Sequence, residues 1–311
     1  MEERKMAKKG RSVATVFILT VILTLVFVGG TLFVLVDKFD ILGTKTTQAA
    51  TTLPEYVPMG FQAEAEHNQT VLAVIGDGEY EDNIVFLLMR FQPTENRIVI
   101  VPVSPRTVCQ LGTEKYSAYE FFRRGGVISA SKAISATMNV PIDRYVYMDN
   151  VCFSTAGDTI FGGVRYSVTQ DVIYENSVGG EDVVIRAGTT VLTSNQARQL
   201  VANPTLDEAY RLSLTATLFT DMLNQAIGDR LYNSLDEYYG IVVNQTFTNI
   251  SFRDYEYRKE AIENMIVPNT KPAVAVIPDG EWNGEEFTVS VEFRNELAEI
   301  FGVAPLEELA Q

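Results

Sequence analysis

Four acidic side chains lie within six positions, in a short polar segment between two apolar runs. The segment follows residues 71–75 (VLAVI), precedes residues 84–89 (IVFLLM), and contains Asp77, Glu79, Glu81 and Asp82. Carboxylates at the end of a buried strand can hold Mg²⁺ while the ion keeps part of its water shell. A solvated turn would have the same composition, because connections between buried strands run over the surface. Two interpretations therefore stand at this point: a metal site, or a solvent-exposed turn.

Arg106 is the basic counterpart of this acidic segment. It follows a third apolar run, residues 98–103, and comes directly after Pro105, whose fixed φ stiffens the turn. Ligands of open α/β sheets gather beyond the carboxyl ends of the strands, so Arg106 and the acids should leave neighbouring strand ends. Arginine forks grip phosphate oxygens, and together with Mg²⁺ they suit a phosphoryl or pyrophosphoryl group. The simpler alternative is a surface ion pair between Arg106 and one acid.

Several other chemistries lack the residues they need. The only histidine, His67, precedes the first apolar run, which argues against a Ser-His-Asp triad and a histidine-rich zinc site. The chain has neither GxxxxGK(S/T) nor GxGxxG after a strand, so a nucleotide cradle has no support. The formal net charge of −15 argues against nucleic acid as a partner, because such proteins need a basic surface to displace counterions.

An uncharged apolar segment near the N-terminus predicts a membrane anchor. Residues 13–36 carry no charge, and at about 1.5 Å per residue a helix of this length, roughly 36 Å, can cross a bilayer core. The apolar core of a cleaved signal peptide is only about 7–15 residues long. The preceding tail, residues 1–12, has five basic residues against two acids and should stay in the cytoplasm. We expect a single-pass protein of the cell membrane whose C-terminal part lies outside the cytoplasm.

The rest of the chain alternates between strand and helix patterns after a linker, residues 37–70. Strands are predicted at 71–75, 84–91, 98–103, 144–148, 273–277 and 286–291, with sheet-edge strands at VRYSV (164–168) and VVIRAG (183–188). Helices are predicted at 117–124, 126–138, 150–158, 194–202, 206–227, 230–239, 253–265 and 293–301. After the transmembrane helix we expect a single αβα domain with a mixed central sheet, residues 71–270. A strand and helix extension, residues 271–311, should pack on it.

Other conspicuous side chains have structural explanations. Cys109 and Cys152 lie in apolar runs, which favours buried thiols over a disulfide. Trp282 lies in an acid-rich turn, DGEWNGEE, where an aromatic ring that caps a hairpin is favoured over one that stacks on a sugar. Arg123 and Arg124, in FFRRGG, lie at a predicted helix end, where cations interact favourably with the helix dipole.

Two longer segments resemble one known family. They are NVPIDRYVYMDNVCFSTAGDTIFGGVRYSV (139–168), with its Pro-Ile-Asp, aromatic strand and Gly-Gly-Val, and IRAGTTVLTSNQAR (185–198). From Val71 to Ile266 the chain resembles the LytR-CpsA-Psr family, membrane-anchored proteins of the bacterial cell envelope. The resemblance implies an enzyme that uses Mg²⁺ to move a phosphate-linked glycopolymer from a polyprenyl-pyrophosphate carrier to peptidoglycan or another wall acceptor. It also implies an apolar tunnel for the lipid through the α/β domain.

The resemblance also assigns site residues. Asp82 falls on an acid of the family's Arg-Ser-Asp element and Asp77 lies near an earlier acid, so both are implied metal ligands. Arg106 falls on the arginine of Pro-Arg-Asp-Thr, and Arg211 falls on an arginine of Arg-x-x-Arg-Gln. Asp82, Arg106 and Arg211 are therefore the expected catalytic residues, with the two arginines gripping the pyrophosphate.

The chain departs from the family pattern at several other positions. Tyr80 stands in place of the first arginine of Arg-Ser-Asp, and Thr107 in place of the acid after Arg106. Ala202 and Pro204 replace the two arginines of Arg-Phe-Arg, and Leu214 and Thr215 replace the last two residues of Arg-x-x-Arg-Gln. Loss of one arginine that neutralises transition-state charge can lower a rate by about 10³–10⁵. Arg198, one turn before Ala202, is expected to help bind substrate as a partial substitute. Two functions stay open: a divergent phosphotransferase, or a degenerate relative that binds a polyprenyl-phosphate lipid or an envelope partner without turnover.

Overall fold

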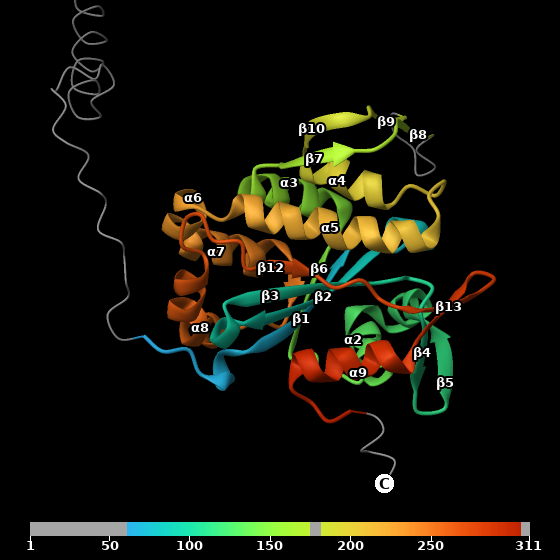
Figure 1. Ribbon diagram of the computed structural model, residues 1–311, viewed down its shortest axis with the longest axis horizontal. Coiled ribbons are helices and arrows are strands. Elements are labelled where there is room, and N and C mark those ends of the chain that lie inside the picture. The colour runs from blue at the N-terminus through green and yellow to red at the C-terminus, as the bar shows by residue number, and fades with distance from the viewer. Residues whose placement is uncertain (1–60, 175–181, 306–311) are drawn as a thin grey trace, which may run out of the picture. The chain divides into compact units, whose positions relative to one another are not determined.

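The structure is a computed structural model that describes residues 61–174 and 182–305 (Figure 1). Within these residues the central sheet has six strands. Its order is β11 (Phe247–Thr248), β6 (Arg144–Met148), β1 (Gln69–Ile75), β2 (Val85–Gln92), β3 (Arg97–Val103) and β12 (Ala273–Ala275). β2 pairs antiparallel with both β1 and β3, whereas β6 runs parallel to β1 and β12 runs parallel to β3. The predicted mixed sheet is therefore confirmed.

The central strands are apolar over most of their length, as expected for a sheet with both faces covered. Along β1, Leu72 and Val74 belong to the core on one face, and Ala73 and Ile75 to the core on the other. Figure 1 shows α2 (Ala118–Met138) and α9 (Val291–Phe301) on one face and α3 (Asn150–Phe161), α4 (Ser194–Val201) and α5 (Glu208–Ala226) on the other. This layering is the αβα arrangement expected from the sequence.

Helix α2 bends where the sequence predicts two helices instead of one. Gly125 and Gly126 have non-helical φ and ψ, so the helix changes direction between the two predicted segments. Just before the bend, Arg123 and Arg124 both bond Glu120, at 3.0 and 3.3 Å, which is a structural role. The predicted helix at 230–239 is likewise divided, into α6 (Asp229–Asn233) and α7 (Leu235–Gln245), before α8 (Phe252–Met265).

VRYSV and VVIRAG, predicted as sheet-edge strands, do form strands, but these strands belong to small sheets apart from the main one. β7 (Val164–Val168) pairs with β10 (Gly188–Leu192), and β8 (Val172–Tyr174) pairs with β9 (Val183–Ile185), as two separate hairpins. Alternate side chains of these strands, such as Val164 and Ile185, pack into the core that α4 and α5 also enter. A strand that packs on helices and a strand at the edge of a sheet both have one buried and one exposed face. The alternation of apolar and polar residues therefore cannot distinguish the two arrangements.

Two further hairpins are present, and the first of them was not predicted. β4 (Val108–Leu111) pairs with β5 (Glu114–Ser117), and β13 (Gly280–Asn283) pairs with β14 (Glu286–Val289). In the second hairpin the ring of Trp282 lies 4.8 Å from that of Phe287, which is the predicted hairpin-capping role. Both cysteines are free thiols, as the sequence favoured, but only Cys109 is buried.

The segment after residue 270 adds strand β12 to the sheet and helix α9 to one face. By their contacts, the described residues all fall within one compact unit. The predicted membrane anchor, residues 13–36, lies outside the described residues and stays a prediction. None of the helices in the described ranges is long and apolar enough to span a membrane.

Candidate active site

The acidic segment after β1 is a tightly held loop. Gly76 has φ +133°, and a Cβ at this position would lie 2.3 Å from the carbonyl oxygen of Asn83, so the turn requires glycine. Gly78 has φ +72° and faces the ring of Phe122. The Tyr119 hydroxyl donates to the carbonyl oxygens of Gly78 and Glu79, at 3.2 and 3.1 Å. These contacts fix where the acids of the loop point.

Three predicted site residues from separate segments meet at one carboxylate oxygen. Asp82 Oδ1 accepts from Arg106 Nη2 at 3.2 Å and from both Nη1 and Nη2 of Arg211 at 3.2 Å. Arg106 comes from the turn after β3, where its backbone N–H donates to Ser104 Oγ at 3.2 Å. Arg211 lies in the first turn of α5, whose N-terminus is capped by Asp207. The structure therefore brings Asp82, Arg106 and Arg211 together.

Glu208 also belongs to the cluster, although the sequence reasoning missed it. Its Oε1 lies 2.5 Å from Arg211 Nη2 and 4.0 Å from Arg106 Nε. The available signal was its position three residues before Arg211 on a helix, a spacing at which opposite charges meet. Glu81 approaches Arg106 at 3.6 Å, and Glu285, from the β13–β14 turn, approaches it at 4.0 Å.

Carboxylates outnumber guanidinium groups in this cluster, and this sets its electrostatics. The Arg211 side chain is only 7% exposed, so its interactions with Asp82 and Glu208 are weakly screened. Burial alone would lower the pKa of Arg106, but Glu208 and Asp82 outweigh it and raise this pKa above its ordinary value. Burial also raises the pKa of the Glu81 carboxyl, although Arg106 acts in the opposite direction. Both guanidinium groups are therefore already engaged by carboxylates.

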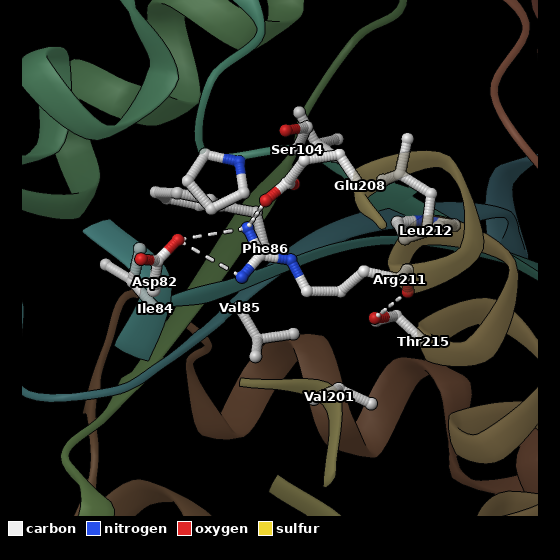
Figure 2. Close-up of a pocket in the computed structure, with 13 residues that line it drawn as sticks. Asp82, Ile84, Val85, Phe86, Ser104, Val201, Glu208, Arg211, Leu212 and Thr215 are labelled. Carbon is white, nitrogen blue, oxygen red and sulfur yellow. Dashed lines mark hydrogen bonds and ion pairs between the residues drawn. The ribbon is translucent and has the colours of Figure 1, made fainter. Parts of the chain in front are cut away.

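A narrow pocket opens beside the cluster, with an empty space of about 320 Å³ including its open mouth (Figure 2). Asp82, Glu208, Arg211 and Thr215 line it together with apolar side chains, among them Val85, Phe86, Val103, Val201 and Leu212. Figure 2 shows the Arg211 guanidinium between the carboxylates of Asp82 and Glu208. The pocket thus joins a charged group of residues to an apolar wall.

Asp77 and Arg198 are not brought to this cluster. Asp77 accepts from the backbone N–H of Asn150 at 3.0 Å and also from its side-chain amide, at the start of α3. Arg198 donates to Asn195 Oδ1 at 3.3 Å and does not line the pocket. Their predicted roles in metal and substrate binding stay predictions.

The described residues contain no group of three or more histidine, cysteine, aspartate or glutamate side chains placed to hold a metal ion. Asp82 could still be one ligand, because Mg²⁺ is commonly held by one or two carboxylates together with substrate phosphates. Oδ1 of Asp82 takes the contacts from both arginines. The donor set fits a cation that arrives with its phosphate ligand.

The positions that depart from the family pattern offer no substitute cation. Leu214 and Ala202 are buried, and Tyr80 is half exposed. Thr215 donates its hydroxyl to the carbonyl oxygen of Arg211 at 2.7 Å, which helps to fix this turn of α5. The hydroxyl of Thr107 is buried and has no hydrogen-bond partner.

Residues 86–207 match the model of the LytR_cpsA_psr family. Over this segment, which is less than half of the chain, the protein is similar to the LytR-CpsA-Psr family. The resemblance found in the two quoted segments is confirmed. The match runs from β2 to the residue before α5, so it includes Arg106 but neither Asp82 nor Arg211. An uncharacterised protein of Staphylococcus aureus is 26% identical over 125 residues, which is 39% of this chain and 30% of that protein. The matched part therefore spans less than a third of the relative's length.

Several solved structures share the fold of this chain. A proposed transcription regulator from Eubacterium siraeum has a TM-score of 0.70 and 21% identity, covering 83% of this chain and 100% of its own. TagV of B. subtilis has a TM-score of 0.59 and 14% identity, covering 76% and 98%. A structure of TagT bound to LI-WTA has a TM-score of 0.58 and 15% identity, covering 79% and 95%. At such identities the likeness concerns the fold.

Proposed function

We propose that the protein is a membrane-anchored phosphotransferase of the cell envelope. It would move a phosphate-linked glycopolymer from a polyprenyl-pyrophosphate carrier to peptidoglycan or another wall acceptor. The anchor would be residues 13–36, with the α/β domain outside the cytoplasm. The match to the family model and the structural likeness to TagT and TagV support a role in wall glycopolymer transfer. A role in transcription has no support from the net charge of −15.

The observation that carries the proposal is the convergence of Arg106 and Arg211 on one oxygen of Asp82. A carboxylate oxygen held by two guanidinium groups occupies a place where a phosphate oxygen would also be stable. A pyrophosphate would take over these hydrogen bonds from Asp82 and Glu208. Mg²⁺, when bound by Asp82 and the phosphates, would neutralise part of their charge.

The pocket supports the choice of a lipid carrier. Its apolar residues, including Val85, Val103 and Leu212, lie beside the charged cluster. The pocket is narrow, so it would have to widen before an isoprenoid segment next to the pyrophosphate could gain from burial there, at roughly 25 cal/mol per Å² of apolar surface. The same site would then hold the charged and apolar parts of one ligand.

The transfer step needs positioned charge and a proton acceptor. The acceptor's hydroxyl oxygen would bond to the phosphorus that carries the glycan, and the bond from that phosphorus to the bridging oxygen would break. Polyprenyl phosphate would leave with the electron pair, while Arg106 and Arg211 neutralise the developing charge. Glu81, whose carboxylate lies 3.6 Å from Arg106 at the edge of the cluster, would take the hydroxyl proton.

One observation favours the second candidate, binding without turnover. Leu214, Thr215 and Ala202 stand at positions where the family resemblance implies further polar or charged groups, and all three are buried. A site with two arginines could retain a pyrophosphate lipid yet stabilise the transition state poorly. The protein would then present a bound lipid to an envelope partner.

The deciding experiment uses the full-length chain in detergent with a polyprenyl-pyrophosphate-linked glycan and Mg²⁺. Mass spectrometry would follow both consumption of the lipid and its retention on the protein. We expect consumption that Asp82→Ala abolishes and that Asp171→Ala leaves unchanged, since Asp171 pairs with Arg186 at an exposed site. Lipid retained but unchanged would establish the second candidate, and neither consumption nor retention would refute both.

A further inference from the structure

A second, wider depression in the protein is lined without any acidic side chain. It lies between the β4–β5 hairpin, the last turn of α2, strand β14 and the start of α9. Its empty space, including the open mouth, is about 960 Å³, against about 320 Å³ for the pocket beside Asp82. The polar side chains that line it are Gln110, Lys115, Thr137, Thr288 and Arg294. We call this depression the β4–β14 groove.

Positive charge in the groove is not neutralised. Within residues 61–174 and 182–305, neither Lys115 nor Arg294 forms an ion pair. Arg294 donates through Nε to the carbonyl oxygen of Ser290 at 3.4 Å, a backbone contact that carries no opposite charge. In a chain with net charge −15, such a groove stands out as a place that attracts anions.

The fold holds the groove open. Thr107 and Cys109 are 0% and 1% exposed, so the alternation of a strand turns Val108 and Gln110 to the open face. The backbone N–H of Gln110 donates to Thr137 Oγ1 at 3.0 Å, which ties β4 to the end of α2. β14 meets this segment at a single isolated bridge, Thr107 with Phe287, among the described residues. Beyond that bridge the two hairpins part, and the groove begins.

The groove is connected to the candidate active site through the backbone. The N–H of Phe287 donates to the carbonyl oxygen of Arg106 at 3.1 Å, just before Thr288 and Val289 enter the groove wall. Glu285, at the turn of the same hairpin, approaches the Arg106 guanidinium at 4.0 Å. Segments that carry Arg106 therefore also form one end of the groove.

We propose that the β4–β14 groove binds an anionic sugar chain, that is, a glycan with carboxylate or phosphate groups. Lys115 and Arg294, on different elements, would each take an anionic group, while Gln110 and Thr288 offer hydrogen bonds to hydroxyl groups. An open groove suits a segment of a polymer better than a small molecule, which favours enclosure. The proposal is independent of turnover at Asp82. The chain could be the acceptor or the glycan of the donor, since both would share this chemistry.

The first test compares sugar chains that differ only in charge. Full-length protein in detergent would be titrated with oligogalacturonates, which carry one carboxylate per sugar, and with neutral dextran fragments of equal length. We expect salt-sensitive binding of oligogalacturonates that Lys115→Gln/Arg294→Gln weakens about tenfold or more. The control is Lys132→Gln/Arg165→Gln, the same charge change at two exposed residues outside the groove. Equal weakening by both double variants, or equal binding of dextran, would overturn the proposal.

A second titration identifies the source of the sugar chain. The same variants would be tested with soluble peptidoglycan fragments and with a polyprenyl-pyrophosphate-linked anionic glycan. If the groove variant binds only the peptidoglycan fragments more weakly, the groove holds the acceptor. If it binds only the lipid-linked glycan more weakly, the groove holds the glycan of the donor. If the groove variant is correctly folded by circular dichroism and changes neither, the proposal fails, whatever happens at Asp82.

Discussion

The pocket and the β4–β14 groove present positive charge in opposite ways. In the pocket, Arg211 is only 7% exposed and is held by Asp82 and by Glu208, the latter at 2.5 Å. In the groove, Lys115 and Arg294 have no ion-pair partner among the described residues. An anion that enters the pocket must displace carboxylates, so the pocket should select for ligands with two or more phosphate charges. The groove requires no displacement, and its binding should fall with salt.

Arg211→Ala should separate the two regions most strongly. Its loss leaves Asp82 and Glu208 near each other without the guanidinium between them, and it removes one of two groups that neutralise the transition state. We expect single-turnover consumption of the lipid-linked glycan, followed by mass spectrometry, to fall about 10³–10⁵-fold. Affinity for oligogalacturonates should stay the same. Turnover within tenfold of the original chain would remove Arg211 from the site.

Alanine substitutions at one glycine in each region test how tightly the two regions are packed. Gly78 in the acidic loop and Gly112 in the groove have φ of +72° and +63°, so alanine at either costs about 1–2 kcal/mol of backbone strain. Only at Gly78 would the new Cβ also meet a neighbour, the Phe122 ring at 2.6 Å. That ring is 8% exposed and packs against Tyr147, so overpacking should add about 1–3 kcal/mol.

Thermal unfolding of the two glycine variants measures the difference. Gly78→Ala should lower the midpoint by more than Gly112→Ala, at roughly 2–4 °C per kcal/mol for a domain of this size. It should also weaken pyrophosphate binding, since Asp82 belongs to the same loop. Equal shifts in the two midpoints would mean that Phe122 yields and that the loop is not held by its packing.

The sequence predicts the layers of the fold much better than it predicts the two binding regions. Buried strands such as β1 and β2 form apolar runs, and the bend of α2 is visible in its paired glycines, because these signals are local. The β4–β5 hairpin is short and largely polar, so it has no apolar period, and its groove depends on β14, far away in the chain.

The candidate site divides in the same way. Asp82, Arg106 and Arg211 could be chosen because each falls on a family motif, and the structure brings them together. Asp77 is only five residues from Asp82 but turns to Asn150, since the loop reverses between them. Glu285 contacts Arg106 from a hairpin about 180 residues later in the chain, and a local sequence pattern cannot predict such a contact.

Glu208→Gln should give the smallest of these effects. It tests whether the carboxylates of the pocket lower its affinity for an entering anion. Glutamine keeps the shape of the side chain but removes the charge that competes with an entering phosphate for Arg211. We expect affinity for inorganic pyrophosphate, measured by isothermal titration calorimetry, to rise about tenfold, the effect of ~1.4 kcal/mol. Glu285→Gln is the matched control, because this glutamate is 87% exposed and lies 4.0 Å from Arg106, where screening leaves little to remove. A fall in affinity for Glu208→Gln would show instead that Glu208 holds the Arg211 guanidinium in its binding position. Asp82 would then be the only carboxylate that competes with an entering anion, and the contrast between the pocket and the groove would rest on it alone.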